Sequence, residues 1–204
     1  MKLYVADYAP NPRRVRWVMN EKGISDIEVA TLDIMRLEHR GHDVVERSGA
    51  SGLPVLELDD GSVIAESVAI GRYLESLYPE PNLFGSDARE IADIEMWTRR
   101  IEQNLATPLM LGVRMKLPAL AVLEKPNDAA ADYFLAQATA FGARLDQRLA
   151  GRDFICGDRV TIADIAAVCA YDFARIIRYR PDKTFENLAL WLDAMRSRPA
   201  KPAV

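Results

Sequence analysis

The chain has 204 residues and a mass of 22.8 kDa, and half of its residues are apolar while 27% are charged. This balance excludes a disordered chain and suits one or two globular domains. The net charge of −4, from 30 acids against 26 bases, argues against a general nucleic-acid-binding protein, which needs a basic face. No apolar run approaches the ~20 residues of a membrane span and the N-terminus lacks a signal-peptide pattern, so we expect a cytoplasmic protein without a membrane partner.

The first eighty residues alternate between strand and helix patterns. Strands are predicted at residues 3–6, 26–32, 54–58 and 62–65, and the last two are joined by Asp59-Asp60-Gly61, a hairpin signal. Helices are predicted at 12–22, which Gly23 ends, and at 67–77, and a short or irregular helix is expected within 35–47. The order is therefore βαβ followed by ββα.

Beyond the proline-rich loop near residue 80 the patterns are helical only. Apolar residues recur at helical spacing over 87–116, 129–150, 162–178 and 188–197. The sequence thus predicts a small α/β domain at residues 1–80, a linker at 81–86 and an all-helical domain at 87–204. Two cysteines, Cys156 and Cys169, form no CxxC motif and are expected to be free thiols in a reducing compartment.

Two segments of the first domain have patterns that suit a binding site. Pro54 stands at the head of a strand, where its missing N–H does least harm and where a trans bond to Leu53 is the default. Glu66 and Ser67 stand at a strand-to-helix turn, where helix N–H groups favour an anion and the carboxylate favours an ammonium. The pair is therefore complementary to an amino-acid head group, although Ser67 could equally be only the cap of its helix.

A third segment, Gly157-Asp-Arg-Val-Thr161-Ile-Ala-Asp164-Ile165, predicts a structural device. Thr161 can cap the following helix, Asp164 can reach back to it as in a capping box, and Val160 and Ile165 can form a hydrophobic staple. The helix that follows is apolar nearly all round, so it should lie at the centre of its domain.

Taken together and in order, the motifs resemble those of a family. The chain resembles the cytosolic glutathione transferases of bacterial type, which have a thioredoxin-like domain followed by a helical-bundle domain. The matching segments are K-L-Y, P-N-x-R-R-V-R-W with E-K-G-I, E-H-R, L-P-V-L-E-L-D-D-G, A-E-S-V-A-I, E-M-W-x-R-R and G-D-R-V-T-I-A-D-I, and they span roughly the whole chain.

The resemblance implies a glutathione site in the first domain. It implies that the backbone of Leu53 pairs with the cysteinyl part of glutathione across a cis bond to Pro54, and that Glu66 and Ser67 hold the γ-glutamyl head. Gly52 replaces a longer polar residue that often reaches the glycyl carboxylate in the family. His39 could supply that contact, or it could be a solvated residue.

The residue that activates the thiol is less obvious. Relatives often place Ser, Cys or Tyr at the end of the first strand or the start of the first helix, to hold glutathione as the nucleophilic thiolate. Here Ala9 occupies the position where Ser or Cys is common, and it cannot donate through a side chain. Asn11 could point its amide at the sulfur, or it could only cap the helix with Pro12 as first residue. Tyr8 is a second candidate.

The expected function is conjugation of glutathione to a small apolar electrophile, with reduction of disulfides by glutathione and a non-catalytic interaction protein as alternatives. We expect no cofactor besides glutathione as co-substrate, and no metal, because Glu38-His39-x-x-His42-Asp43 holds the only two imidazoles. The electrophile pocket is assigned to Tyr8, Met110, Val113 and Arg114. A homodimer is expected by resemblance, with the apolar Leu83 and Phe84 as candidates for a partner pocket.

Overall fold

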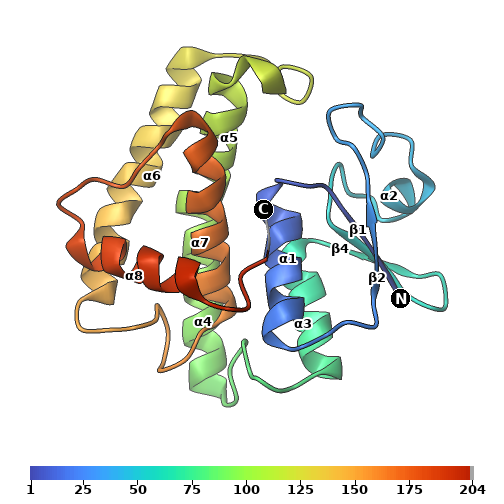
Figure 1. Ribbon diagram of the computed structural model, residues 1–204, viewed down its shortest axis with the longest axis horizontal. Coiled ribbons are helices and arrows are strands. Elements are labelled where there is room, and N and C mark those ends of the chain that lie inside the picture. Colours follow the sequence, from blue (N-terminus) through green and yellow to red (C-terminus); the bar gives the residue numbers. More distant parts are fainter. Residues whose placement is uncertain (203–204) are drawn as a thin grey trace. The chain divides into compact units, whose positions relative to one another are not determined.

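The structure, a computed structural model, describes residues 1–202 and divides into two compact units. The first comprises Met1–Asn82 together with Pro202, and the second comprises Leu83–Lys201. Figure 1 shows both units and labels most of their elements. No helix of the described part is long and apolar enough to cross a membrane.

The first unit is a four-stranded mixed sheet with helices on both faces. Its elements are β1 (Lys2–Val5), α1 (Pro10–Glu21), β2 (Glu28–Thr31), α2 (Asp43–Arg47), β3 (Val55–Glu57), β4 (Val63–Ala65) and α3 (Ser67–Leu77). The strand order is β2-β1-β3-β4, in which β1 and β2 are parallel while β3 runs antiparallel to both β1 and β4. This is the βαβ-ββα order that the sequence predicts, whereas residues 35–41 form turns, and helix within the expected range 35–47 is confined to α2.

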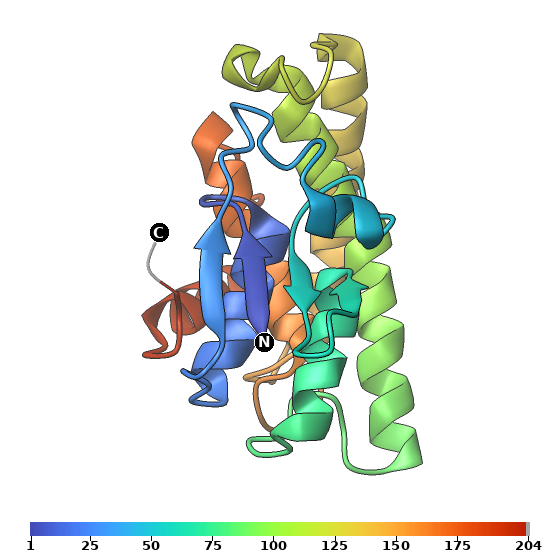
Figure 2. The same ribbon diagram turned by 90° about the vertical axis from the view of Figure 1, so that its right-hand side faces the viewer.

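Alternation along β1 decides what each face of the sheet buries. Leu3 and Val5 are fully buried, and Leu3 pairs with the equally buried Leu56 of β3. Tyr4 points to the opposite face, as expected from the period of two, and packs there with Val44, Val45 and Val55. Helices α1 and α3 pack together on one face and α2 covers the other (Figure 2).

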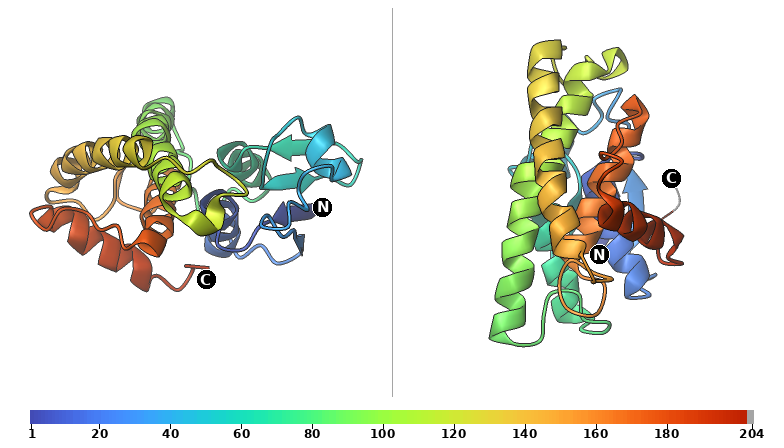
Figure 3. Two further views of the ribbon diagram at one scale, coloured as in Figure 1. Left: turned by 90° about the horizontal axis from the view of Figure 1, so that it is seen from above. Right: turned by 90° about the vertical axis from the view of Figure 1, so that its left-hand side faces the viewer.

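The second unit is built of helices alone in the part of the chain that the structure describes. Its α-helices are α4 (Ala88–Ile101), α5 (Thr107–Lys116), α6 (Asp128–Leu149), α7 (Ile162–Ala174) and α8 (Glu186–Ser197), with short 3-10 turns at Pro118–Leu120 and Arg175–Ile177. Helix α7 packs against α4, α5 and α8, and α6 packs against α5 and α8 (Figures 1 and 3). Residues 162–171 of α7 are all buried, as its apolar sequence predicts.

A π-helical segment, Glu102–Ala106, joins α4 to α5, and the amide of Thr107 donates to the carbonyl of Glu102, five residues earlier. Pro108 gives the reason. A proline inside a helix lacks the N–H and its ring crowds the carbonyl four residues before it, so the backbone widens just ahead of it. The helix expected over 87–116 is therefore one continuous element with a widened turn.

The first residues of the second unit correct one expectation. Leu83 and Phe84 are 0% and 3% exposed, and the carbonyl of Leu83 accepts a 3.0 Å hydrogen bond from the amide of Ile162. Both side chains are therefore buried within the chain itself. Their assignment to a partner's pocket was wrong, because local polarity around a residue does not reveal long-range packing.

Candidate functional site

The start of α1 has a different register from the one that the sequence favours. Ala9 is the N-cap, with φ −77° and ψ 136°, and Pro10 is the first helical residue. Asn11 is therefore the second residue of the helix, and no side chain caps it. The alternative in which Asn11 only caps the helix is wrong, since Asn11 lies inside the first turn.

The two prolines leave few free donors at this helix start. The first four N–H groups of a helix lack partners within it, but Pro10 and Pro12 have no N–H at all. The amide of Arg13 already donates to the carbonyl of Ala9 at 3.2 Å. Only the N–H groups of Ala9 and Asn11 remain to meet a ligand, together with the side-chain amide of Asn11.

Asn11 and Tyr8 both present accessible polar groups here. The side chain of Asn11 is half-buried, and it forms no hydrogen bond within residues 1–202. Tyr8 has a φ of 63° and is 74% exposed. A positive φ at a bulky residue is uncommon and costs free energy, and such residues concentrate at functional sites.

The bond between Leu53 and Pro54 is cis, as the resemblance implies. Leu53 precedes β3, and its backbone N–H and C=O form no hydrogen bond with any part of the chain that the structure describes. Free backbone groups beside a strand can pair with an extended peptide, as in strand addition. The position therefore suits the backbone of a short peptide.

The start of α3 holds the Glu66-Ser67 pair. Glu66 is the N-cap with φ 68° and ψ 117°, it makes no side-chain cap, and its carboxylate is exposed. Ser67 is the first helical residue and is 4% exposed. Ser67 therefore does not cap the helix, and the alternative in which it is only the cap is wrong.

Sequence reasoning missed Arg14, which contacts Ser67. Arg14 is 2% exposed, and its Nη1 donates a 3.0 Å hydrogen bond to Ser67 Oγ. A signal was available, because Arg14 and the buried Val18 stand four residues apart and so share one face of α1. An arginine is usually solvated, and that expectation hid it.

His39 lies in the turns between β2 and α2. It is 6% exposed, so the alternative of a solvated residue is wrong. His42 is the N-cap of α2, and its ring lies 5.2 Å from that of Tyr4. Among residues 1–202 no group of three or more His, Cys, Asp or Glu could hold a metal ion.

The other predicted pocket residues are in the second unit, on α5. Val113 has no exposed surface, so its assignment to the electrophile pocket has no support. Met110 and Arg114 are half-buried, and burial lowers the pKa of the Arg114 guanidinium.

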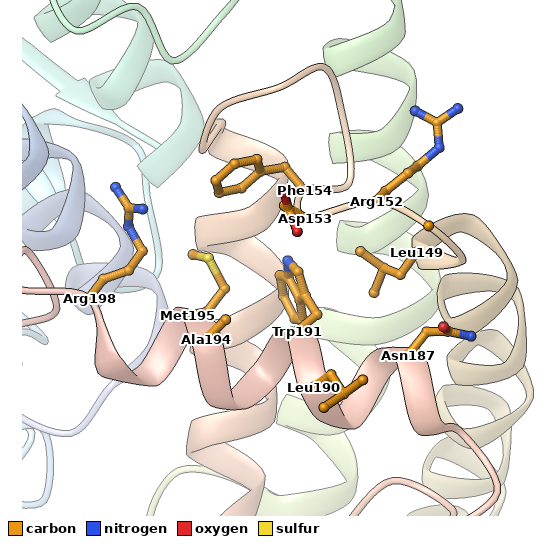
Figure 4. A pocket seen from close by; sticks show the side chains of 11 residues that line it. Leu149, Arg152, Asp153, Phe154, Asn187, Leu190, Trp191, Ala194, Met195 and Arg198 are labelled. Carbon is orange, nitrogen blue, oxygen red and sulfur yellow. The ribbon is translucent and has the colours of Figure 1, made fainter.

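A pocket of about 540 Å³ lies within the second unit, between α8 and residues 151–154 (Figure 4). Trp191, Met195 and Phe154 provide apolar walls, and Arg152 and Arg198 stand at opposite ends. None of the predicted site residues lines it.

Comparisons with known proteins agree with both units. Residues 8–77 match the glutathione S-transferase N-terminal domain and residues 111–199 match the C-terminal domain of the same family. "Glutathione S-transferase 2" of Saccharomyces cerevisiae is 28% identical over 98% of this chain and 87% of its own length.

Comparison with solved structures identifies the same family. A glutathione S-transferase domain-containing protein of Marinobacter aquaeolei superposes with a TM-score of 0.93 at 32% identity, covering 99% of this chain and all of its own. Ure2p, solved in complex with glutathione, shares the fold with a TM-score of 0.84 at 23% identity over 98% of this chain and 90% of its own. The chain belongs to the glutathione S-transferase family.

Proposed function

We propose that the first unit binds glutathione and that the protein conjugates its thiolate to a small apolar electrophile. One observation carries the proposal. The start of α3 offers a hydroxyl, free helix N–H groups and a carboxylate in consecutive residues, Glu66 and Ser67. A γ-glutamyl head, with its carboxylate and ammonium, is complementary to that set.

The peptide part of glutathione has a matching place at Leu53. The free backbone N–H and C=O of Leu53 can pair with the cysteinyl N–H and C=O. His39 stays the candidate for the glycyl carboxylate, because Gly52 has no side chain to offer.

The thiol is the demanding part of this site. A free thiol has a pKa near 8.5, and lowering it by two units needs roughly 2.7 kcal/mol of extra stabilisation of the thiolate. A helix N-terminus supplies ~0.3–1 kcal/mol, or up to ~2 kcal/mol in favourable geometry. Pro10 and Pro12 reduce the donors at α1, so we assign the remaining stabilisation to the side-chain amide of Asn11, with Tyr8 beside the electrophile.

The experiment compares glutathione binding by calorimetry in two serine variants of α3. Ser67→Ala should weaken binding by roughly 1.5–3 kcal/mol, the scale of a hydrogen bond to a charged group. Ser76→Ala is the matched control, because Ser76 lies on the same helix and its hydroxyl donates only to the carbonyl of Arg72. Equal affinity in wild type and Ser67→Ala would place the site elsewhere.

Reduction of disulfides by glutathione is a second candidate, because a site in which Asn11 holds the thiolate of glutathione suits it and needs no thiol of the protein. Both cysteines are buried in the second unit, and burial raises the pKa of Cys156 to about 12. Bound glutathione would itself attack the disulfide, forming a mixed disulfide and releasing the other half as a thiolate. A panel of aryl halides, epoxides, peroxides and mixed disulfides separates the two chemistries, and variants of Tyr8, Met110 and Arg114 test the electrophile pocket.

We retain the homodimer as a proposal from family membership alone, since Leu83 and Phe84 no longer support it. Light scattering should give about 46 kDa, twice the 22.8 kDa of one chain. A mass near 23 kDa at micromolar concentration would refute the dimer. The cytoplasmic location likewise remains a prediction.

A further inference from the structure

The contact between Arg14 and Ser67 joins two helices beneath the proposed γ-glutamyl site. Arg14 is on α1 and Ser67 begins α3, and the two helices pack together in the first unit. The hydrogen bond from Arg14 Nη1 to Ser67 Oγ is 3.0 Å long and buried. With 2% of its surface exposed, Arg14 has almost no surface of its own to offer a ligand.

The chemistry of the two groups fixes the direction of this hydrogen bond. A guanidinium has donors and no acceptor, whereas a hydroxyl can do either. Ser67 Oγ must therefore accept from Arg14, and its own hydrogen is left to donate elsewhere. Within residues 1–202 no acceptor takes that hydrogen, because the only hydrogen bond of the Ser67 side chain is the one from Arg14.

We propose that Arg14 is a positioning residue: it holds the Ser67 hydroxyl as a donor and so makes this subsite selective for a carboxylate. This inference rests on the proposed function. The ligand group is the α-carboxylate of the γ-glutamyl moiety. The positive charge of Arg14 and the start of α3 favour the same anion, and a hydrogen bond to an ionised acceptor is stronger than a neutral one. The exposed carboxylate of Glu66, the residue before Ser67, carries the charge that suits the ammonium of the same moiety.

The test measures the dissociation constants of three thiol peptides. These are glutathione, 4-aminobutyryl-cysteinyl-glycine, which lacks the α-carboxylate, and glutaryl-cysteinyl-glycine, which lacks the ammonium. In the wild type, loss of the carboxylate should weaken binding by about tenfold to a hundredfold. Arg14→Met should reduce this ratio to below about threefold and leave the penalty for losing the ammonium unchanged.

Two further variants separate positioning from packing. Arg14→Lys keeps a cation that only donates, so it should restore most of the carboxylate selectivity. Arg16→Met is the matched control, because it removes the same charge from the same helix but from an arginine that is 40% exposed and 3.9 Å from Asp7. Adding Ser67→Ala to Arg14→Met should cause little further loss of affinity for glutathione, since both changes remove the hydrogen bond between Arg14 and Ser67.

The outcomes are distinguishable. A wild type that does not bind glutathione refutes the proposed function. A wild type that binds, with Arg14→Met weakening all three peptides equally or none of them, overturns the role of Arg14 alone. If Arg14→Met shows no cooperative thermal transition, Arg14→Gln replaces it, because an amide can accept as well as donate. Arg14→Gln should lower the carboxylate ratio about fivefold, and an unchanged ratio overturns the proposal.

Discussion

The helices of the two units begin in different ways. In the second unit, Asp87 caps α4 by accepting from two backbone amides, Asn127 caps α6, and Thr161 and Asp164 form the capping box of α7. In the first unit the N-caps of α1, α2 and α3 are Ala9, His42 and Glu66, and none of them makes a side-chain cap.

This difference distinguishes the second unit, whose helix starts are satisfied by the protein itself, from the first unit, whose helix starts are left for a ligand. A buried helix start without a cap leaves its N–H groups unsatisfied, which costs free energy. In the second unit side chains of the protein meet that requirement at α4, α6 and α7. At α8 the N-cap Phe185 makes no side-chain cap, and Asp146 of α6 accepts from the amide of Leu188 instead. At α1 and α3 the same groups stay free, so a bound anion can satisfy them. The first unit thus combines two uncapped helix starts with the unpaired backbone of Leu53, as a binding site for an anionic peptide requires.

The largest effect is expected where the capping is most complete. The carboxylate of Asp164 is fully buried and accepts from the amides of Ile155 and Thr161, the hydroxyl of Thr161 and the indole of Trp191, at 2.9–3.1 Å. Asp164→Ala leaves these buried donors without a partner, and the free energy of unfolding should fall by about 3–5 kcal/mol.

Urea denaturation measures this loss, with Asp87→Ala as the control. The cap at Asp87 is exposed and should be worth only about 1 kcal/mol. If Asp164→Ala costs no more than Asp87→Ala, the contrast between a buried and an exposed cap is wrong.

The stability of the second unit should also depend on pH through Asp164. Burial raises the pKa of Asp164 to about 6, even though its hydrogen bonds act in the opposite direction. The native state therefore holds a proton that the unfolded chain has released above pH ~4, so stability falls as pH rises from 4 to 6, by up to about 3 kcal/mol. Asp164→Asn should abolish this dependence in urea denaturation from pH 4 to 7.

Glu90 should make the stability depend on pH in the opposite direction. Its 2.6 Å ion pair with Arg159, together with hydrogen bonds from Ser86, lowers its pKa to about 2. Its contribution is fully present above the ordinary carboxyl pKa and is lost as pH falls toward 2. Glu90→Gln should therefore lower the free energy of unfolding above pH 5. It should leave unchanged the fall in stability between pH 4 and 6 that depends on Asp164. A wild type whose stability rises steadily from pH 4 to 6 would contradict the assignment to Asp164.

The smallest effect on stability is expected at the uncapped start of α1. Because Asn11 does not cap the helix, Asn11→Ala should change the free energy of unfolding by less than about 0.5 kcal/mol. If its amide holds the thiolate, the pKa of bound glutathione should rise by roughly a unit, equivalent to ~1.4 kcal/mol. The pH dependence of thiolate absorbance measures it.

Asn11→Asp is the informative control for that measurement. A carboxylate in the first turn suits the helix dipole but repels a thiolate. If this variant keeps the wild-type thiol pKa and turnover, Asn11 does not hold the sulfur, and Tyr8 or the free backbone amides must do so.

The sequence predicts what depends on local pattern. Helix α3 runs from Ser67 to Leu77 as its apolar spacing indicates, and the capping box at Thr161 and Asp164 forms as predicted. The cis bond at Pro54 followed from ordered motifs, against the default for a single X–Pro bond.

The features that the sequence did not predict are those that local pattern alone does not determine. Pro10 and Pro12 are both suited to open a helix, so the first turn of α1 has two plausible registers two residues apart. Likewise the burial of Arg14 depends on α3, more than fifty residues later in the chain, and no spacing rule within α1 shows what it contacts.

The π-helical segment between α4 and α5 has a consequence for the spacing of core residues. Ile101, Leu105, Leu109 and Val113 recur every four residues, and all four are fully buried. In a regular α-helix of 3.6 residues per turn, that interval would carry the apolar stripe progressively around the axis. The wider turn at Glu102–Ala106 rotates less per residue, which keeps the stripe on one side. Deleting a single residue there would let the backbone close into a regular α-helical turn, so Leu109 and Val113 would stay on the buried side, whereas the same deletion within the regular part of α4 would turn every later side chain by about 100°.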